Sequence, residues 1–396
     1  MTSARSRSRS DTGNPFLVDR LQPFGTTIFA EMSARALETG SINLGQGFPD
    51  ADGPDVVKQA AIDAIAAGHN QYPPGIGVPE LRHAVRDHQR RFYGLEFDAD
   101  AEVLVTTGAT EAIAGALLAL CGPGDEVVTF EPYYDSYAAC IAMSGAQRRT
   151  VLLRPPDYAF DPDELRRAIT PRTKVVLLNS PHNPTGKVFA RAELELVAAL
   201  AQEHDLLVVT DEVYEHLVFE GEHIPIATLP GMRDRTVTIS SGGKTFSFTG
   251  WKVGWACAMP DLVTAVKTAK QFLSYVSGGP FQEAIAVGLR LPDAYFSSLA
   301  AGLRAKRDRL CQGLDEAGFT VFRPQGTYFV TTDITALGED DGMAFCRALP
   351  ERCGVVAIPS VVFYDDVSAG RSLVRWACCK RADVLDEACA RLKDLR

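Results

Sequence analysis

The sequence lacks the features that would tie the protein to a membrane or to nucleic acid. It contains no apolar run of the roughly 18 residues that a membrane-spanning helix needs. Its 40 Lys and Arg residues are outnumbered by 50 Asp and Glu residues, which gives a formal net charge of −10. Proteins that bind DNA, RNA or anionic lipid usually carry an excess of positive charge instead. We therefore expect no nucleic-acid partner, no membrane association and a cytoplasmic location.

Motifs built from cysteine or histidine are also missing. The nine cysteines include no Cys-x-x-Cys pair, and most lie inside apolar runs such as LLALCGPG at 117–124. The seven histidines show no His-Glu-x-x-His pattern. Isolated cysteines in apolar runs are typical of buried free thiols in a reducing compartment. The sequence thus predicts neither a disulfide framework nor a metal site.

The N-terminal segment lacks the pattern of a targeting signal. Residues 1–14 alternate arginine and serine without the apolar core of a signal peptide, so we expect a solvated, flexible leader. The rest of the chain is expected to form an N-terminal arm at 15–50 that joins a small domain, a large domain at 51–290 and the small C-terminal domain at 291–396.

Short apolar runs alternate with amphipathic helical patterns from about residue 100. Strands that are buried on both faces produce such runs, so the pattern predicts an α/β fold with a mostly parallel sheet sandwiched by helices. After about residue 290 the order becomes that of a smaller α+β domain. The predicted strands are 102–107, 125–131, 149–153, 174–180, 205–212 and 235–241; the predicted helices include 54–67, 110–120, 135–144, 191–204, 295–317 and 342–352.

Small and aromatic residues follow the first two of these strands. Ala109 and Thr110 open the helix after strand 102–107, where free backbone N–H groups can bind an anion such as phosphate. Tyr134 follows the next strand, and its ring can stack on a planar ligand. Ligands bind at the carboxyl ends of parallel strands, which makes these residues candidates for a site. An ordinary strand–helix turn and a core aromatic are the structural alternatives.

An asparagine and an aspartate follow two later strands. Asn183 lies in a proline-braced loop, and Asp211 ends an apolar strand three residues before Tyr214. A buried carboxylate is costly unless it has a partner, so Asp211 is well placed to pair with a cationic ligand atom. Capping of a turn or helix is the alternative role for Asn183 and Asp211.

Lys244 lies in SSGGKTFSFTGWKVGW (240–255), for which there are two interpretations. Gly-Lys-Thr resembles the end of a phosphate-binding P-loop, but that motif requires glycine at position 238, which is threonine. The other interpretation is covalent: a lysine with a lowered pKa can bond to an aldehyde. The common aldehyde cofactor is pyridoxal 5'-phosphate (PLP). The missing glycine favours the covalent interpretation.

PLP needs an amine, an acid opposite its pyridine nitrogen, an anion site, a stacking face and a donor to its phenolic oxygen. The sequence supplies a candidate for each need at the ends of successive strands. These candidates are, in the same order, Lys244; Asp211; Ala109 and Thr110 with Ser241 and Lys252; Tyr134; and Asn183 with Tyr214.

In the order of these candidate residues along the chain, the sequence resembles the fold-type I, class I/II PLP-dependent aminotransferases over about residues 16–395. The motifs that carry the resemblance are NLGQGFPD, NQYPPG, EPYYDSY, NSPHNPTGKV, DEVYEHL, SSGGKTFSFTGWKVGW and LVRWACCK. Within this family the sequence is similar to the branch of kynurenine aminotransferase, glutamine transaminase K and methionine aminotransferases. It looks closest to the actinobacterial N-succinyldiaminopimelate aminotransferases.

The resemblance implies a role for each candidate. Lys244 becomes the lysine that bonds to the cofactor, and Asp211 keeps the pyridine nitrogen protonated. Asn183 and Tyr214 would contact the ring oxygen O3'. The phosphate and the ring face would be held by Ser241, Lys252, the amides of Ala109 and Thr110, and Tyr134.

The resemblance also implies a homodimer with shared active sites, in which Tyr72 reaches the phosphate of the other subunit. Arg375 and Asn183 would bind the substrate α-carboxylate, and Gly45 would lie in a loop that closes over the substrate. Phe24, Tyr134 and Phe281 are expected to line the substrate pocket.

The implied activity is ping-pong transfer of an amino group between an L-amino acid and a 2-oxo acid, with Lys244, Asp211 and Tyr214 as the catalytic residues. Two substrate classes stay open: N-succinyldiaminopimelate in lysine biosynthesis, or aromatic, methionine and glutamine donors together with cysteine-conjugate β-lyase activity. A PLP-binding transcriptional regulator is disfavoured, because residues 1–14 are too short for a helix-turn-helix.

Overall fold

The structure is a computed structural model, and it describes residue 14, residues 16–25 and residues 27–395. The predicted leader at 1–14 lies outside the described residues except for Asn14. Within the described part of the chain, no helix is both long and apolar enough to cross a membrane. All nine cysteines are free, and eight of them are buried, which confirms the prediction of buried thiols.

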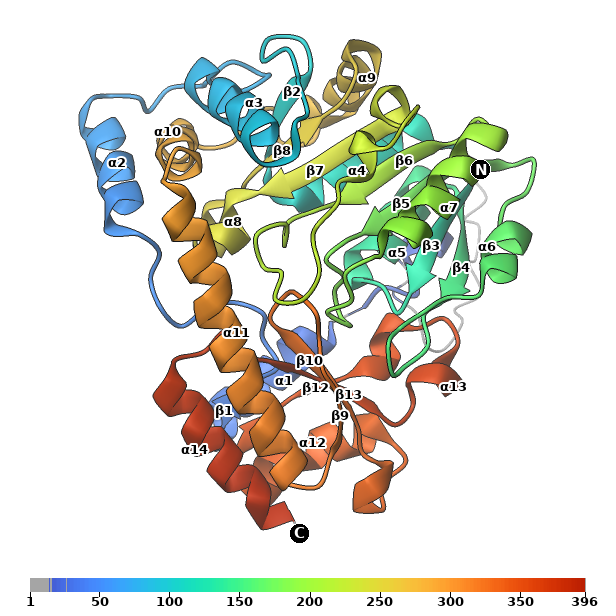
Figure 1. Ribbon diagram of the computed structural model, residues 1–396, viewed down its shortest axis with the longest axis vertical. Coiled ribbons are helices and arrows are strands. Elements are labelled where there is room, and N and C mark those ends of the chain that lie inside the picture. The colour runs from blue at the N-terminus through green and yellow to red at the C-terminus, as the bar shows by residue number, and fades with distance from the viewer. Residues whose placement is uncertain (1–13, 15, 26, 396) are drawn as a thin grey trace, which may run out of the picture.

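A seven-stranded sheet forms the centre of the larger part of the molecule (Figure 1). Its strands are β2 (Val103–Thr107), β3 (Glu126–Glu131), β4 (Gln147–Leu152), β5 (Thr173–Asn179), β6 (Leu207–Asp211), β7 (Thr236–Ser241) and β8 (Val253–Cys257). Their order across the sheet is β2-β8-β7-β6-β5-β3-β4, and every neighbouring pair is parallel except the two that include β8. The predicted α/β fold with a mostly parallel sheet is confirmed.

Helices cover both faces of this sheet because alternate strand residues point to opposite sides. The first face packs on α4 (Gly108–Leu120), α5 (Asp135–Ser144) and α9 (Pro260–Lys270); the second packs on α6 (Pro162–Ala168), α7 (Arg191–Glu203), α2 (Asp55–Ala66), α3 (Pro79–Tyr93) and α10 (Gly279–Leu289). Val127 of β3 belongs to the first core and its neighbour Val128 to the second. Continuous apolar strands therefore face helices on both sides.

A smaller antiparallel sheet lies below the large one in Figure 1, in the order β12-β13-β10-β9. Its strands are β9 (Thr320–Phe322), β10 (Phe329–Asp333), β12 (Ile358–Pro359) and β13 (Leu373–Ala377), and it packs with α11 (Asp293–Glu316), α12 (Gly342–Cys353) and α14 (Ala382–Leu392). The N-terminal elements α1 (Ile28–Thr39) and β1 (Ile42–Asn43) lie with this unit, and β1 pairs in parallel with β11 (Val355–Val356).

The long helix α11 connects the two parts of the molecule. Phe296, near its start, belongs to the core that contains α2, α3 and α10, whereas Leu310 belongs to the core that contains α12 and α14. A single helix therefore anchors in both cores. The domain boundaries expected at 50 and 290 stay a prediction.

Candidate active site

A cavity of about 410 Å³ opens at the carboxyl ends of β5, β6 and β7. Ten of the twelve residues to which the sequence gives a catalytic, cofactor-binding or substrate-binding role line it, although they come from segments spread over most of the chain. They are Ala109, Thr110, Tyr134, Asn183, Asp211, Tyr214, Ser241, Lys244, Lys252 and Arg375. Gly45 and Tyr72 are not among the residues that line the cavity.

Lys244 lies on α8 (Gly242–Thr245), the one-turn helix that follows β7. Its Nζ lies 5.8 Å from the ring centre of Tyr214 and 5.7 Å from that of Tyr328. Burial is the main cause that lowers the pKa of Lys244 to about 8, against the opposing effects of Cys379 and Asp211. A large fraction of the amine is therefore neutral near pH 8, and the neutral amine is the nucleophilic and basic form.

Asp211 ends β6 and is only 5% exposed. The hydroxyl of Tyr137 donates a 2.6 Å hydrogen bond to its Oδ2, and the N–H of Val213 donates to Oδ1 over 3.3 Å. Burial raises the pKa of Asp211, although these two hydrogen bonds and the Lys244 cation oppose the rise. A cationic group of a ligand would therefore be a favourable ion-pair partner for this buried carboxylate.

Arg375 comes from the small sheet, on β13, and is 2% exposed. Its Nη1 donates to Oδ1 of Asn183 over 3.1 Å, and its Nη2 donates to the carbonyl oxygen of Gly45 over 3.0 Å. Its Nε has no hydrogen-bond partner within the described part of the chain. Gly45 therefore lies outside the cavity wall but holds the guanidinium, and this guanidinium keeps donor capacity for a carboxylate.

The start of α4 forms a cramped, cationic corner of the cavity. Gly108 has φ +72°, and a Cβ at this position would lie 3.3 Å from Nζ of Lys252. A Cβ on Gly254 of β8 would lie 2.7 Å from the backbone nitrogen of Ala109. Lys252 makes no ion pair with any residue that the structure describes. The corner thus combines helix amides with a free ammonium group, the arrangement that binds phosphate.

Two aromatic residues that were expected in the substrate pocket lie elsewhere. Phe281 stacks on Trp251 with ring centres 4.9 Å apart, and neither Phe281 nor Phe24 lines the cavity. The aromatic residues that do line it besides the tyrosines are Phe29 and Phe329. The expectation was wrong because a pocket of this kind collects side chains from both sheets, and the sequence pattern does not show which rings meet there.

Tyr72 is 82% exposed on the loop before α3, with its ring 5.8 Å from that of Tyr275. In one chain it therefore has no part in the cavity wall. Its proposed contact with a second subunit stays a prediction.

Sequence reasoning missed Tyr137 and Asp135. Tyr137 stands three residues after Tyr134, so both tyrosines lie on one face of the start of α5 and both line the cavity. This spacing in EPYYDSY was the available signal. Asp135 also lines the cavity, and burial raises the pKa of its carboxyl group.

The sheet is mostly parallel and covered by helices, Lys244 follows β7, and Asp211 ends the neighbouring strand β6. This arrangement defines a fold-type I transferase. The chain belongs to the aminotransferase class I and II family, whose model matches residues 39–392. The resemblance drawn from the motifs is thereby confirmed, and the protein is an aminotransferase.

Three relatives illustrate the range of this family. The structure of N-succinyldiaminopimelate aminotransferase from Mycobacterium tuberculosis matches with a TM-score of 0.94 and 54% identity, covering 96% of this chain and 100% of that one. A methionine aminotransferase of Escherichia coli is 39% identical over 97% of this chain and 100% of its own length. A kynurenine–oxoglutarate transaminase 3 of Mus musculus is 36% identical over 93% and 88%, respectively.

Proposed function

We propose that the protein is a PLP-dependent aminotransferase that moves an amino group between an L-amino acid and a 2-oxo acid by a ping-pong mechanism. The observation that carries the proposal is the joint placement of Lys244, Asp211 and the start of α4 on one cavity. An amine, a buried acid and an anion-binding corner are the three features that the aldehyde, the ring nitrogen and the phosphate of PLP require.

The residues of the cavity fit this cofactor. The buried carboxylate of Asp211 has a raised pKa and gains a partner from a protonated pyridine nitrogen. Gly108 and Gly254 leave space where a side chain would collide with Lys252 or with the start of α4, so a phosphate can approach the helix amides. When bound, PLP supplies an electron-withdrawing ring that stabilises negative charge on the substrate Cα.

In this proposal the side chains of the chain bind the substrate and move its proton. Arg375 binds the α-carboxylate, and its contacts with Asn183 and Gly45 fix the orientation of the guanidinium. The amine of Lys244 removes the Cα proton and holds it at Nζ, from where it would pass to the aldehyde carbon that bound PLP supplies. A pKa of about 8 suits this role, because such an amine both accepts and releases a proton near neutral pH.

We extend the proposal to a homodimer in the cytoplasm. Tyr72 and Tyr275 are exposed side by side, and Phe272 and Leu273, two to three positions before Tyr275 in the sequence, are exposed as well. An apolar surface of this kind is typical of a protein–protein interface. It supports a dimer in which Tyr72 completes the phosphate site of the second subunit.

N-Succinyldiaminopimelate is the proposed amino-acid substrate, which gives the enzyme a place in lysine biosynthesis. The support is the 54% identity with the Mycobacterium tuberculosis aminotransferase over 96% of the chain. A second candidate is a broad specificity for aromatic, methionine and glutamine donors with β-lyase activity on cysteine conjugates. The apolar rings of Phe29 and Phe329 in the cavity favour this second candidate.

The test is a panel of amino donors with 2-oxoglutarate as the acceptor. N-Succinyldiaminopimelate, methionine, glutamine and kynurenine are compared by kcat/KM, and a cysteine conjugate is added without an acceptor. The highest kcat/KM for the succinylated donor supports the first candidate. Faster turnover of methionine or kynurenine, or pyruvate and ammonia from the conjugate, supports the second. Absence of turnover with every donor contradicts the proposed function.

A further inference from the structure

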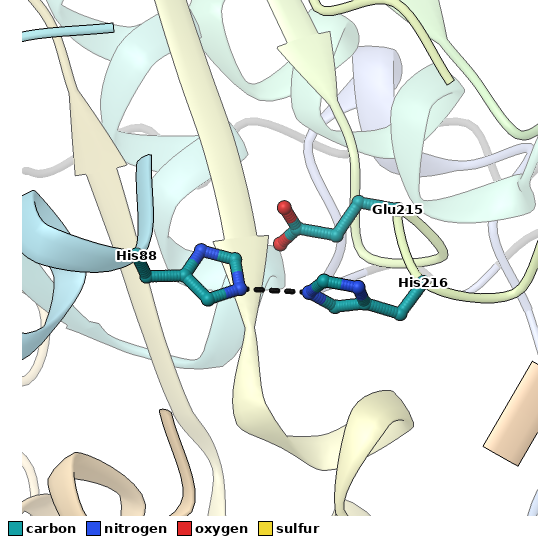
Figure 2. A group of neighbouring side chains, drawn as sticks. All are labelled: His88, Glu215 and His216. Atoms are coloured by element: carbon teal, nitrogen blue, oxygen red, sulfur yellow. Dashed lines mark hydrogen bonds between the residues drawn. The ribbon is translucent and has the colours of Figure 1, made fainter. Parts of the chain in front are cut away.

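Two histidines and a glutamate lie close together in the protein interior, next to the segment that contains Asp211 and Tyr214. His88 comes from α3, whereas Glu215 and His216 lie in the turn that follows β6 (Figure 2). One ligand atom from each of the three side chains lies within 4.8 Å of the others. The two imidazoles face each other, with their Nε2 atoms 2.7 Å apart.

The cluster contains buried polar atoms that make no hydrogen bond of standard geometry with the described residues. His88 is 2% exposed and Glu215 is 5% exposed. Oε1 of Glu215 accepts a 2.5 Å hydrogen bond from the hydroxyl of Ser240. The hydroxyl of Tyr93 lies close enough to the Glu215 carboxyl group to interact with it, but neither Oε2 of Glu215 nor Nδ1 of His88 makes a hydrogen bond of standard geometry with a described residue. A buried carboxylate oxygen without a partner is unfavourable, and a cation is the group that satisfies it best.

The surroundings hold the three side chains in a fixed arrangement. The ring centre of His88 lies 4.8 Å from that of Phe92, and the ring centre of His216 lies 4.3 Å from that of Phe296. Oε2 of Glu212, the residue that directly follows β6, lies 2.9 Å from Nε2 of His223 and pairs with it. His216 is partly exposed, whereas His88 and Glu215 are buried, so His216 is on the solvent side of the cluster.

The competing explanation is a direct hydrogen bond between the two imidazoles. It accounts for the 2.7 Å separation, but it leaves Oε2 of Glu215 with no hydrogen bond of standard geometry and only the hydroxyl of Tyr93 nearby. Two nitrogens on one tetrahedral zinc ion would stand about 3.3 Å apart, so the rings need to separate by only a fraction of an ångström. The same three side chains can then point at a single ion.

We propose that His88, Glu215 and His216 form a binding site for a divalent cation of the zinc type, with a water molecule as the remaining ligand. Two imidazoles and one carboxylate are a ligand set of zinc and cobalt, and they are unlike the all-oxygen sets of calcium or magnesium. The ion connects α3 to the segment that carries Asp211 and Tyr214. Its role is structural, because the cluster lies outside the wall of the active-site cavity.

The test uses the full-length, cofactor-loaded protein without a polyhistidine tag, after dialysis against a chelator. Zn²⁺ and Co²⁺ are titrated while stoichiometry, Tm and visible absorbance are recorded. Variants H88Q and H216Q remove one ligand each, and H83Q on the same helix is the matched control. We expect a single equivalent to bind to the wild type and to H83Q, with a rise in Tm and the intense absorbance of tetrahedral cobalt. In H88Q and H216Q, binding becomes at least roughly tenfold weaker.

Circular dichroism of each variant shows whether it is folded. If H88Q or H216Q does not fold, the cobalt spectrum of the wild type decides the question. A tetrahedral spectrum with saturation at one equivalent supports the site. A wild-type protein that binds neither ion stoichiometrically, a cobalt spectrum like that of the hydrated ion, or unchanged binding by a folded H88Q overturns the proposal.

Discussion

The hydroxyl of Tyr137 donates a 2.6 Å hydrogen bond to Oδ2 of Asp211, and both groups are buried at the wall of the active-site cavity. This bond is one of the contacts that keep the Asp211 carboxyl group charged, against a burial that raises its pKa. Tyr137 thus acts through Asp211, and it is a positioning residue for the proposed pyridine nitrogen.

The first prediction concerns this hydrogen bond. Tyr137→Phe removes it, so the pKa of Asp211 rises further and the carboxylate is a poorer partner for a cationic ring nitrogen. A hydrogen bond to a charged group contributes about 1.5–3 kcal/mol, so kcat should fall roughly 10- to 100-fold. Tyr133→Phe is the matched control, because the hydroxyl of Tyr133 binds Asp365 and does not line the cavity. Equal kinetics of the two variants would show that Tyr137 has no part in the site.

The second prediction concerns the pH dependence of cofactor loading. The amine of Lys244 must be neutral to bond to an aldehyde, and its pKa is about 8. Below that pH the ammonium form predominates, so the rate at which the PLP-free protein gains its visible absorbance band should rise with pH and level off above about 8. A rate that continues to rise beyond pH 10, as for an ordinary lysine, is incompatible with the lowered pKa.

The third prediction concerns Arg375. Arg375→Lys cannot keep both Asn183 and Gly45 as partners while it binds a carboxylate through two parallel hydrogen bonds. The loss is worth about 3 kcal/mol, so kcat/KM for amino donors should fall about 100-fold, whereas PLP affinity stays close to that of the wild type. Arg371→Lys on the exposed surface serves as the control. An unchanged kcat/KM in Arg375→Lys would show that Arg375 does not bind the substrate carboxylate.

The fourth prediction concerns the space at the start of α4. In Gly254→Ala the new Cβ would lie 2.5 Å from the carbonyl carbon of Gly108, so the helix start has to move. Such overpacking costs about 1–3 kcal/mol of stability, and we expect a lower Tm together with weaker PLP binding. Gly250→Ala has no atom within 4 Å of the new Cβ and should leave both quantities unchanged. PLP affinity that falls equally in the two variants would argue against a phosphate site at this corner.

The fifth prediction tests the shared site. Lys244→Ala and Tyr72→Ala each impair every site of a homodimer. In a mixed dimer, one site combines an intact Lys244 with an intact Tyr72 from the other subunit. Mixing the two impaired proteins under conditions of subunit exchange should therefore raise the activity above that of either protein alone. Recovery no greater than the residual activity of Tyr72→Ala alone would mean that Tyr72 acts within its own chain or not at all.

The sequence predicted the parallel strands and most of the helices because their apolar runs and periodicities are local signals. Strand β8 was missed, together with α9 and α10. It is only five residues long, contains Gly254 and runs antiparallel between β7 and β2, so its position depends on partners that lie far away in the sequence. Because β8, α9 and α10 were all missed, the sequence-based prediction contained no helix or strand between residues 242 and 290.

The candidate site was predictable where each strand end carries a distinctive residue, as at Asp211 and Lys244. It was not predictable where the contact crosses between the two sheets. Only the family resemblance, and no local pattern, placed Arg375 in the site, where it reaches Asn183 across 192 positions of sequence. Phe329 replaces the expected Phe281 in the cavity wall. The His88–His216 pair shows the same limit, because 128 positions separate two residues whose nitrogens touch. No spacing pattern indicates such a pair.

The central claim, that Lys244 carries the cofactor of this aminotransferase, is tested most directly by trapping the bond. The purified protein is loaded with PLP, reduced with borohydride, digested and analysed by mass spectrometry, with Lys244→Ala treated in parallel. The account predicts loss of the visible absorbance band and a phosphopyridoxyl group on the peptide that contains Lys244, with no such modification of this peptide in the variant. A modification confined to another lysine, or none in a protein that transfers amino groups, would contradict it.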